Sequence, residues 1–223
     1  IHGQNVGAAD TDFLLSTQIQ LIHVVGEESF GYFAVPTPGQ RNSAPDYFGM
    51  VDNISFDQPH GVFDGVEDAF SVRLATATQD AEILYTVDGS VPSIGPDGEQ
   101  NGRLYKEPIF IDRTTTLRAV GIRPGYRPSS IGTRTYLFLS DVVQQSSPPP
   151  GYPSTWGSTF TDWGMDQDAG NLQLISGNSK HTVAESREVI KSALRSLPTL
   201  SIVLDKEDLF GAERGIYVHT QGR

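Results

Sequence analysis

Residues 105–129 read YKEPIFIDRTTTLRAVGIRPGYRPS, and this stretch decides the predicted fold. Two sets of side chains alternate in its centre: Leu117, Ala119 and Gly121 against Arg118, Val120 and Ile122. A period of two is typical of a β-strand with two different faces. Turn residues bound this strand on both sides, with Asp112 before it and the Pro124-Gly125 pair after it.

The same alternation continues on both sides of this stretch. Further short β-type runs are expected at residues 54–56, 61–63, 70–74, 83–87, 108–111 and 131–139. An Asp88-Gly89 turn ends one of them, and no helical period interrupts the series. Six or seven strands in about 85 residues predict a mainly β fold, an immunoglobulin/fibronectin-III-like β-sandwich over residues 54–140.

Ordered blocks in this region carry a family resemblance. They are ILYTVDGSVPS at 83–93, the stretch 105–129 quoted above, and TYLF at 135–138. Together they resemble the C-terminal domain of chitobiases and β-hexosaminidases, a fibronectin-III-like module. The resemblance implies an accessory fold in an extracellular setting and does not imply catalysis. The loop at 94–103, IGPDGEQNGR, is longer and more polar than this pattern has.

The N-terminal segment, residues 1–42, predicts part of a separate β domain. Strands are expected at 13–16, 19–25 and 30–35, and the prolines at 36 and 38 end the last one. The stretch YFAVPTPGQRN at 32–42 resembles the end of a lamin-tail-type domain of bacterial surface proteins. Residues 43–53 then form an acidic connector.

The C-terminal third changes character. Residues 141–155 include three consecutive prolines and predict a stiff linker. Thr182 and Glu185 form a capping-box pattern that starts a helix, and Pro198 ends it. The apolar run 200–204 predicts a buried strand, residues 206–210 one helical turn, and 215–218 another strand.

Two stretches of this third resemble the opening of a CotH-family domain: DWGMDQD at 162–168 and ALRSLPTLSIVLDKEDLFGAERGIY at 193–217. CotH proteins are spore-coat and surface proteins, and some are atypical protein kinases. The resemblance places the family's catalytic acids after residue 223. We therefore expect residues 156–223 to be the N-terminal part of an α+β domain, and the whole chain to be a piece of a longer protein.

Charge and composition exclude several classes of function. The chain has 223 residues, a net charge of −11 and no cysteine. Residues 1–69 hold ten acids and one base, whereas residues 70–139 are nearly neutral. A basic face for nucleic acid is missing, Cys-based zinc sites and disulfides are excluded, and no apolar run is long enough to span a membrane. The five histidines are scattered without metal-ligand spacing, and no Gly-rich phosphate loop is present.

Two kinds of binding site remain candidates. Tyr105, Tyr126, Trp156 and Trp163 are the candidates for stacking on a sugar ring, with burial as ordinary packing the alternative. Asp166 and Asp168 suggest a Ca²⁺ site. However, Gly170 and Asn171 are swapped relative to an EF-hand loop, so a solvated loop is the alternative.

These observations predict a non-catalytic structural or adhesive module of a secreted or cell-surface multidomain bacterial protein. Its expected partners are other domains or chains of the same surface assembly. Two alternatives remain open: a carbohydrate-binding accessory module that binds glycans, and part of a CotH-type kinase.

Overall fold

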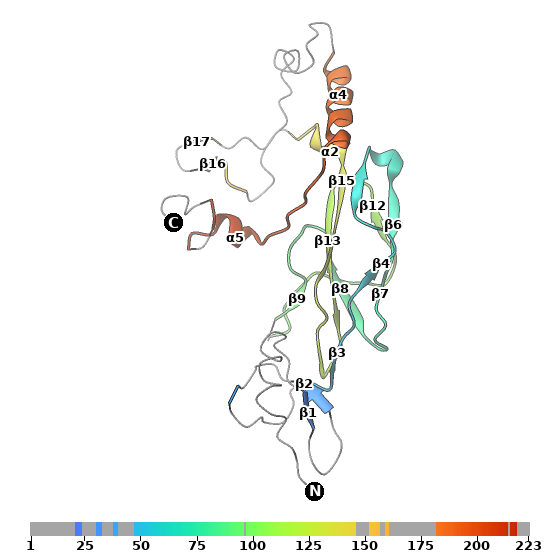
Figure 1. Ribbon diagram of the computed structural model, residues 1–223, viewed down its shortest axis with the longest axis vertical. Coiled ribbons are helices and arrows are strands. Elements are labelled where there is room, and N and C mark those ends of the chain that lie inside the picture. Colours follow the sequence, from blue (N-terminus) through green and yellow to red (C-terminus); the bar gives the residue numbers. More distant parts are fainter. Residues whose placement is uncertain are drawn as a thin grey trace.

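The computed structural model describes residues 21–23, 30–32, 38–39, 47–95, 97–145, 152–156, 159–160, 182–213 and 215–217. Strands dominate these residues, which confirms the mainly β prediction. Figure 1 shows an elongated arrangement, with the first strands at the lower end and the longest helix at the upper end. The strands form several small sheets, and a closed sandwich is not confirmed.

The largest sheet has five strands. In spatial order they are β11 (Arg103–Leu104), β8 (Glu82–Thr86), β13 (Thr115–Ile122), β15 (Gly132–Phe138) and β5 (Gly61–Phe63). The first four pair antiparallel, and β5 pairs parallel to β15. The alternation read at residues 117–122 therefore belongs to the central strand β13, as predicted.

Two-stranded pairs make up the other sheets of the described residues. They are β1 (Leu21–His23) with β2 (Phe30–Tyr32), β3 (Gly49–Met50) with β14 (Tyr126–Arg127), β4 (Ser55–Phe56) with β7 (Leu74–Ala75), β6 (Phe70–Val72) with β12 (Ile109–Ile111), β9 (Ser93–Ile94) with β10 (Gln100–Asn101), and β16 (Thr155–Trp156) with β17 (Thr159–Phe160). Only β3 and β14 among these pairs run parallel. Residues 47–53, assigned by sequence to the connector, thus supply β3 and the fully buried Val51.

The core lies between the five-stranded sheet and the pairs β4–β7 and β6–β12. One layer contributes Ile83, Leu117, Ala119, Tyr136 and Phe138, and the other contributes Ile54, Val72, Leu74, Ile109 and Ile111. Aromatic rings fill one end, where Phe63 lies 4.8 Å from Phe70 and 5.3 Å from Phe138 between ring centroids. Two facing layers are what period-two strands produce when their apolar faces are buried against each other.

Four helical segments complete the described structure. They are the 3₁₀ turn η1 (Val66–Asp68) and the helices α2 (Leu139–Val142), α4 (Val183–Ser196) and α5 (Lys206–Phe210). The capping box predicted for α4 is present, since Glu185 N donates to the Thr182 hydroxyl and Thr182 N donates to the Glu185 carboxylate. The single turn predicted at 206–210 is α5.

Two strand predictions in the C-terminal third are wrong. Residues 200–204 are not a buried strand: Leu200 is 83% exposed and Ile202 is 71% exposed, and no strand of the described residues pairs with them. Residues 215–217 form a turn, with Tyr217 N donating to the Leu209 carbonyl. Both sequences have strand propensity, but a strand also requires a neighbour. The predicted strand at 13–16 and residues 146–151 of the predicted linker 141–155 lie outside the described residues.

Candidate functional site

The first candidate site is the junction of β14 and β3, where two aromatic rings each lie against a glycine of the other segment. A Cβ on Gly49 would lie 2.6 Å from the Tyr126 ring, and one on Gly125, which has a φ of +74°, would lie 2.9 Å from the Phe48 ring. Glycine is therefore needed at both positions for the rings to lie this close. Phe48 N donates to the Gly125 carbonyl at 2.9 Å and holds the two segments together.

The two rings of this junction differ in how much surface they offer. Tyr126 is half-buried, and the Arg123 guanidinium lies 4.3 Å from its ring centroid, in cation–π geometry. Phe48 is 78% exposed. Of the two, Phe48 offers the freer face for stacking. It was not among the residues predicted to bind sugar, because it lies in a segment assigned to a connector.

Tyr105 lies against the core. Its ring meets that of Tyr85 edge-on, with centroids 6.4 Å apart, and its N–H donates to the Ile83 carbonyl at 2.8 Å. This placement fits the packing alternative better than the sugar-binding prediction, because one side of the ring is occupied by apolar side chains. Trp156 belongs to β16, but its side chain is outside the described structure, as are Trp163, Asp166 and Asp168. The calcium prediction stays a prediction.

A second candidate site is a polar cavity of about 220 Å³ beside the Asp88 turn. Asp88 Oδ1 accepts from the Ser90 hydroxyl at 2.7 Å and from Ser90 N at 3.0 Å. The hydroxyl hydrogen bond is the main reason why the pKa of the Asp88 carboxyl lies below its usual value. Asn101 Nδ2 donates to the Val91 carbonyl at 2.6 Å, and Arg118 Nη1 donates to the Gly89 carbonyl at 3.1 Å. These polar groups mainly tie the 88–103 loop to the sheet.

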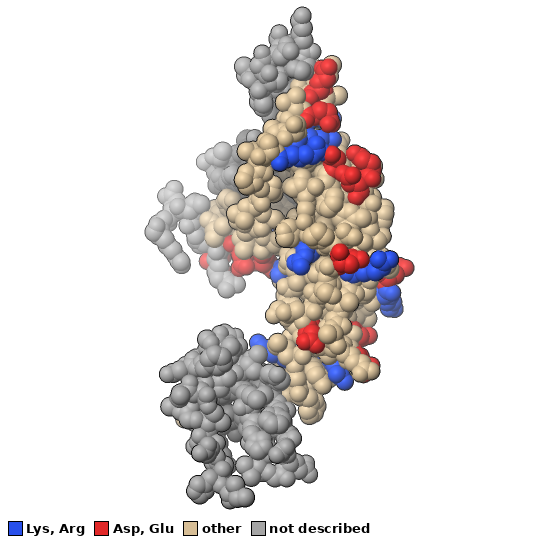
Figure 2. Space-filling view, turned by 45° about the vertical axis from the view of Figure 1, so that its right-hand side comes forward, with Lys and Arg blue, Asp and Glu red and all other residues tan. Residues whose placement is uncertain are grey.

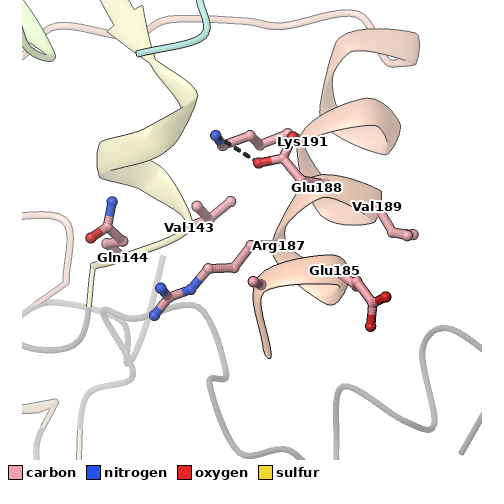
Figure 3. A pocket seen from close by; sticks show the side chains of 8 residues that line it. Val143, Gln144, Glu185, Arg187, Glu188, Val189 and Lys191 are labelled. Carbon is pink, nitrogen blue, oxygen red and sulfur yellow. Dashed lines mark ion pairs between the residues drawn. The ribbon is translucent and has the colours of Figure 1, made fainter. Parts of the chain in front are cut away.

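A third candidate is a cavity of about 590 Å³ between the end of α2 and the first half of α4. In Figure 3 Arg187 and Lys191 extend from α4 toward Val143 and Gln144, while Glu185 and Val189 point away. Lys191 Nζ lies 3.1 Å from Glu188 Oε1, so the charge on this wall is partly neutralised. A largely apolar cavity with mixed charges does not select one class of ligand.

This cavity marks a joint between α4 and the β body, which is the group of sheets and the core of residues 47–145. Val143 and Ile190 are buried against each other, with Leu194 packed beside them. Arg195 of α4 forms an ion pair with Asp64, which follows β5. The helix is therefore fastened to the end of the body where β15 passes into α2.

The described residues also limit what chemistry can be assigned. Within them, no three His, Asp or Glu side chains gather in a way that could hold a metal ion, so Asp88, Asp97 and Glu99 do not converge into a site. None of the described helices is long and apolar enough to cross a membrane. On the face drawn in Figure 2, acidic and basic side chains of the described part lie interspersed.

The comparison with protein families decides the nature of the β body. Residues 72–136 match the family model described as Fn3 associated. They form an Fn3-associated domain. The match covers less than a third of the chain and extends from the end of β6 into β15. No curated protein and no solved structure matches the chain significantly.

Some of the candidate sites lie inside this domain and others lie outside it. The Asp88 cavity, Tyr105 and Tyr126 lie inside the Fn3-associated domain, whereas Phe48 and the α4 cavity lie outside the matched residues. Strands β3, β4 and β5 precede the match but pair with strands inside it. An Fn3-associated domain is consistent with an accessory part of a larger protein.

Proposed function

We propose that this chain is a non-catalytic structural module of a secreted or cell-surface multidomain bacterial protein, in which the Fn3-associated domain is a spacer that resists a pulling force. One observation carries the proposal: early strands pair in parallel with late strands at two places. Gly49 and Met50 of β3 pair with β14, and residues 61–63 of β5 pair with 136–138 of β15.

This topology determines how a pulling force acts on the domain. Because the paired strands run in the same direction, the chain enters at the β3 end and leaves at the α2 end, as Figure 1 shows. A force between those ends slides β5 past β15, so all the hydrogen bonds between them resist together. An antiparallel terminal pair would instead be peeled apart one bond at a time.

The packing around the parallel pair favours the same role. Phe63 of β5 stacks on Phe138 of β15, and the Ser140 hydroxyl donates to the Asp64 carbonyl at 2.6 Å. Ser140 N donates to the same carbonyl at 2.9 Å. Sliding β5 along β15 therefore also breaks a buried aromatic contact and the two hydrogen bonds that follow the strand.

Single-molecule force spectroscopy on the whole chain tests the proposal. Neighbouring residues of a strand direct their backbone N–H groups to opposite sides. One of the two variants Gly61→Pro and Val62→Pro therefore removes an N–H group that faces β15, because proline has no N–H. The loss of one hydrogen bond, about 1 kcal/mol, speeds forced unfolding about fivefold in the affected variant. Ile94→Pro is the matched control, since Ile94 lies in the short antiparallel β9–β10 pair away from the force path. If both β5 variants unfold under force like Ile94→Pro, the proposed mechanical role is wrong.

The neighbours of this spacer are part of the same proposal. We assign residues 1–42 to the end of a lamin-tail-like domain and 156–223 to the opening of a CotH-like domain. The antiparallel β1–β2 pair supports the first assignment, and the capped helix α4 followed by α5 supports the second. The partners are then adjacent domains or chains of the same surface assembly.

A second candidate function, glycan binding, is favoured by the exposed Phe48 ring, which lies against Gly125 close in sequence to the stacked Arg123–Tyr126 pair. An exposed ring with polar neighbours can stack on the apolar face of a sugar. We expect glycan-array binding by the intact chain to be lost in Phe48→Ala and Tyr126→Ala and kept in Phe110→Ala, whose ring is also exposed but lies on β12. The absence of binding to any glycan by the unaltered chain would eliminate this candidate.

A further inference from the structure

Residues 199–204, TLSIVL, form an extended strap between α4 and α5 that lies on the outer face of the five-stranded sheet. Figure 1 shows the strap leaving the end of α4 next to β15 and continuing away from it toward α5. Ser201 Oγ lies 2.8 Å from Thr135 Oγ of β15, and Val203 approaches Gly89 to within 3.9 Å of where a Cβ would lie. The residues that alternate with these two are more exposed than Val203: Leu200 is 83% exposed, Ile202 71% and Leu204 45%. The contacts of the strap with the sheet thus fall on two alternate residues, as they would for a β-strand, and Val203 is the more buried of the two.

The backbone of the strap is open to a partner. In the part of the chain that the structure describes, residues 198–204 take part in no backbone–backbone hydrogen bond. The strap contains no glycine and no charge, and two of its residues, Ile202 and Val203, are β-branched aliphatics. Extended segments of this composition with unpaired N–H and C=O groups are templates for strand addition.

We propose that the strap pairs antiparallel with the strap of a second copy of this chain, about a two-fold axis at Ile202. In this register Ile202 faces Ile202 of the other copy, Leu200 faces Leu204, and Ser201 faces Val203. Every outward apolar side chain then meets an apolar side chain, which is the self-complementarity that an isologous two-fold interface requires.

The charges on either side of the strap favour the antiparallel direction. Residues 183–196 before it carry a net charge of +1, and residues 205–213 after it carry −3. Antiparallel pairing brings the basic side of one copy to the acidic side of the other. Parallel pairing would place the two −3 segments together, where like charges repel. The pairing of straps is independent of the proposed mechanical role, since it involves neither β5 nor β3.

Sedimentation of the intact chain over a range of concentrations tests the pairing. We expect the mass to rise from 24.3 kDa toward twice that value, and Ile202→Lys to stay at the lower mass because two lysines would face each other at the axis. Val66→Lys is the matched control, since Val66 is 69% exposed but lies in η1. Circular dichroism confirms that both variants keep the β fold. A monomer at every concentration, or a dimer that Ile202→Lys leaves intact, would overturn the proposal.

Single cysteines test the register directly, because the chain contains no other cysteine. Directly opposed residues in an antiparallel pair have Cα atoms about 4.5–5.5 Å apart, within the range that a disulfide spans. Ile202→Cys should form a disulfide dimer on oxidation, and Val66→Cys should not. A mixture of Leu200→Cys and Leu204→Cys should form the heterodimer well above either variant alone. Equal cross-linking of Ile202→Cys and Val66→Cys, or preferential Leu200–Leu200 cross-linking, would contradict the antiparallel pairing.

Discussion

Replacing Phe138 by alanine should destabilise the Fn3-associated domain more than a loss of apolar surface alone would suggest. Phe138 is 1% exposed and stands at the end of β15, where its ring stacks on Phe63 with centroids 5.3 Å apart. Phe70 and Tyr136 close the same cluster, with centroids 5.2 Å apart. The truncation leaves a cavity lined by aromatic rings, which cannot collapse into it without leaving their own contacts.

The expected magnitude follows from the burial of this ring. Truncation of a fully buried phenylalanine costs about 3–5 kcal/mol, and an aromatic pair adds about 0.5–1.5 kcal/mol to the area term. A domain of this size has about 5–15 kcal/mol of stability in all. Since 1 kcal/mol shifts the Tm of a domain of 60–100 residues by about 4–8 °C, the Tm should fall by at least about 12 °C.

Urea and thermal unfolding followed by circular dichroism measure this loss. Phe110→Ala is the control, because Phe110 is 64% exposed on β12 and its truncation should cost less than about 0.5 kcal/mol. If Phe138→Ala loses less than about 1 kcal/mol, or no more than Phe110→Ala, the aromatic cluster is not the packed end of the core that we describe.

Two further predictions concern single hydrogen-bonded groups. Burial raises the pKa of the Tyr136 phenol to about 12, whereas its pKa in the unfolded chain is about 10. As the pH rises, the unfolded chain therefore loses this proton first. The stability that Tyr136 contributes below pH 10 should be lost between pH 10 and 12. Tyr136→Phe, which also loses the hydrogen bond to the Gln58 carbonyl, should be about 1 kcal/mol less stable at neutral pH and show a shallower decline over that range; identical urea-unfolding profiles against pH would refute this. Thr182→Ala removes the N-cap of α4 and should cost that helix about 1 kcal/mol. Amide hydrogen exchange should become faster in residues 183–196 and stay unchanged in β13. Thr114→Ala is the contrast: Thr114 Oγ accepts from Phe138 N, so this variant should speed exchange in β15 instead.

Alternation made the strands of the β body predictable from sequence. Residues 117–122 lie in β13 as expected, because a strand with pairing neighbours on both sides and one face in the core satisfies both its backbone and its side chains. The capping box at Thr182 was predictable for a similar reason: it is satisfied within four residues and needs no tertiary partner. Sequence patterns of this kind predict the structure correctly when that structure is local or repetitive.

The wrong or missing predictions concern residues whose structure depends on a contact that is distant in the chain or absent. The apolar run 200–204 predicts a buried strand, but burial depends on a neighbouring strand. In the described structure no strand pairs with the run, and Ser201 and Val203 contact the sheet face. Phe48 could not be predicted as a candidate from the sequence, because its position at the surface depends on the pairing of β3 with β14. Strand β14 lies about 75 residues later in the chain. Candidate sites in an accessory β domain are hard to predict because their loops carry few chemically distinctive residues.

The parallel pairing of early with late strands also sets a length. Had β5 paired antiparallel to β15, the chain would enter and leave the domain at the same end, and segments on either side would lie close together. Because β5 runs parallel to β15, the β3 end and the α2 end are separated by at least the length of β15, whose seven residues span about 23 Å at 3.3 Å per residue. The packing of Ile190 and Leu194 on Val143, with the Arg195–Asp64 ion pair beside it, then holds α4 at the far end of that span. Separation with a fixed attachment at the exit is the geometry that a spacer needs, and it follows from the direction of one short edge strand.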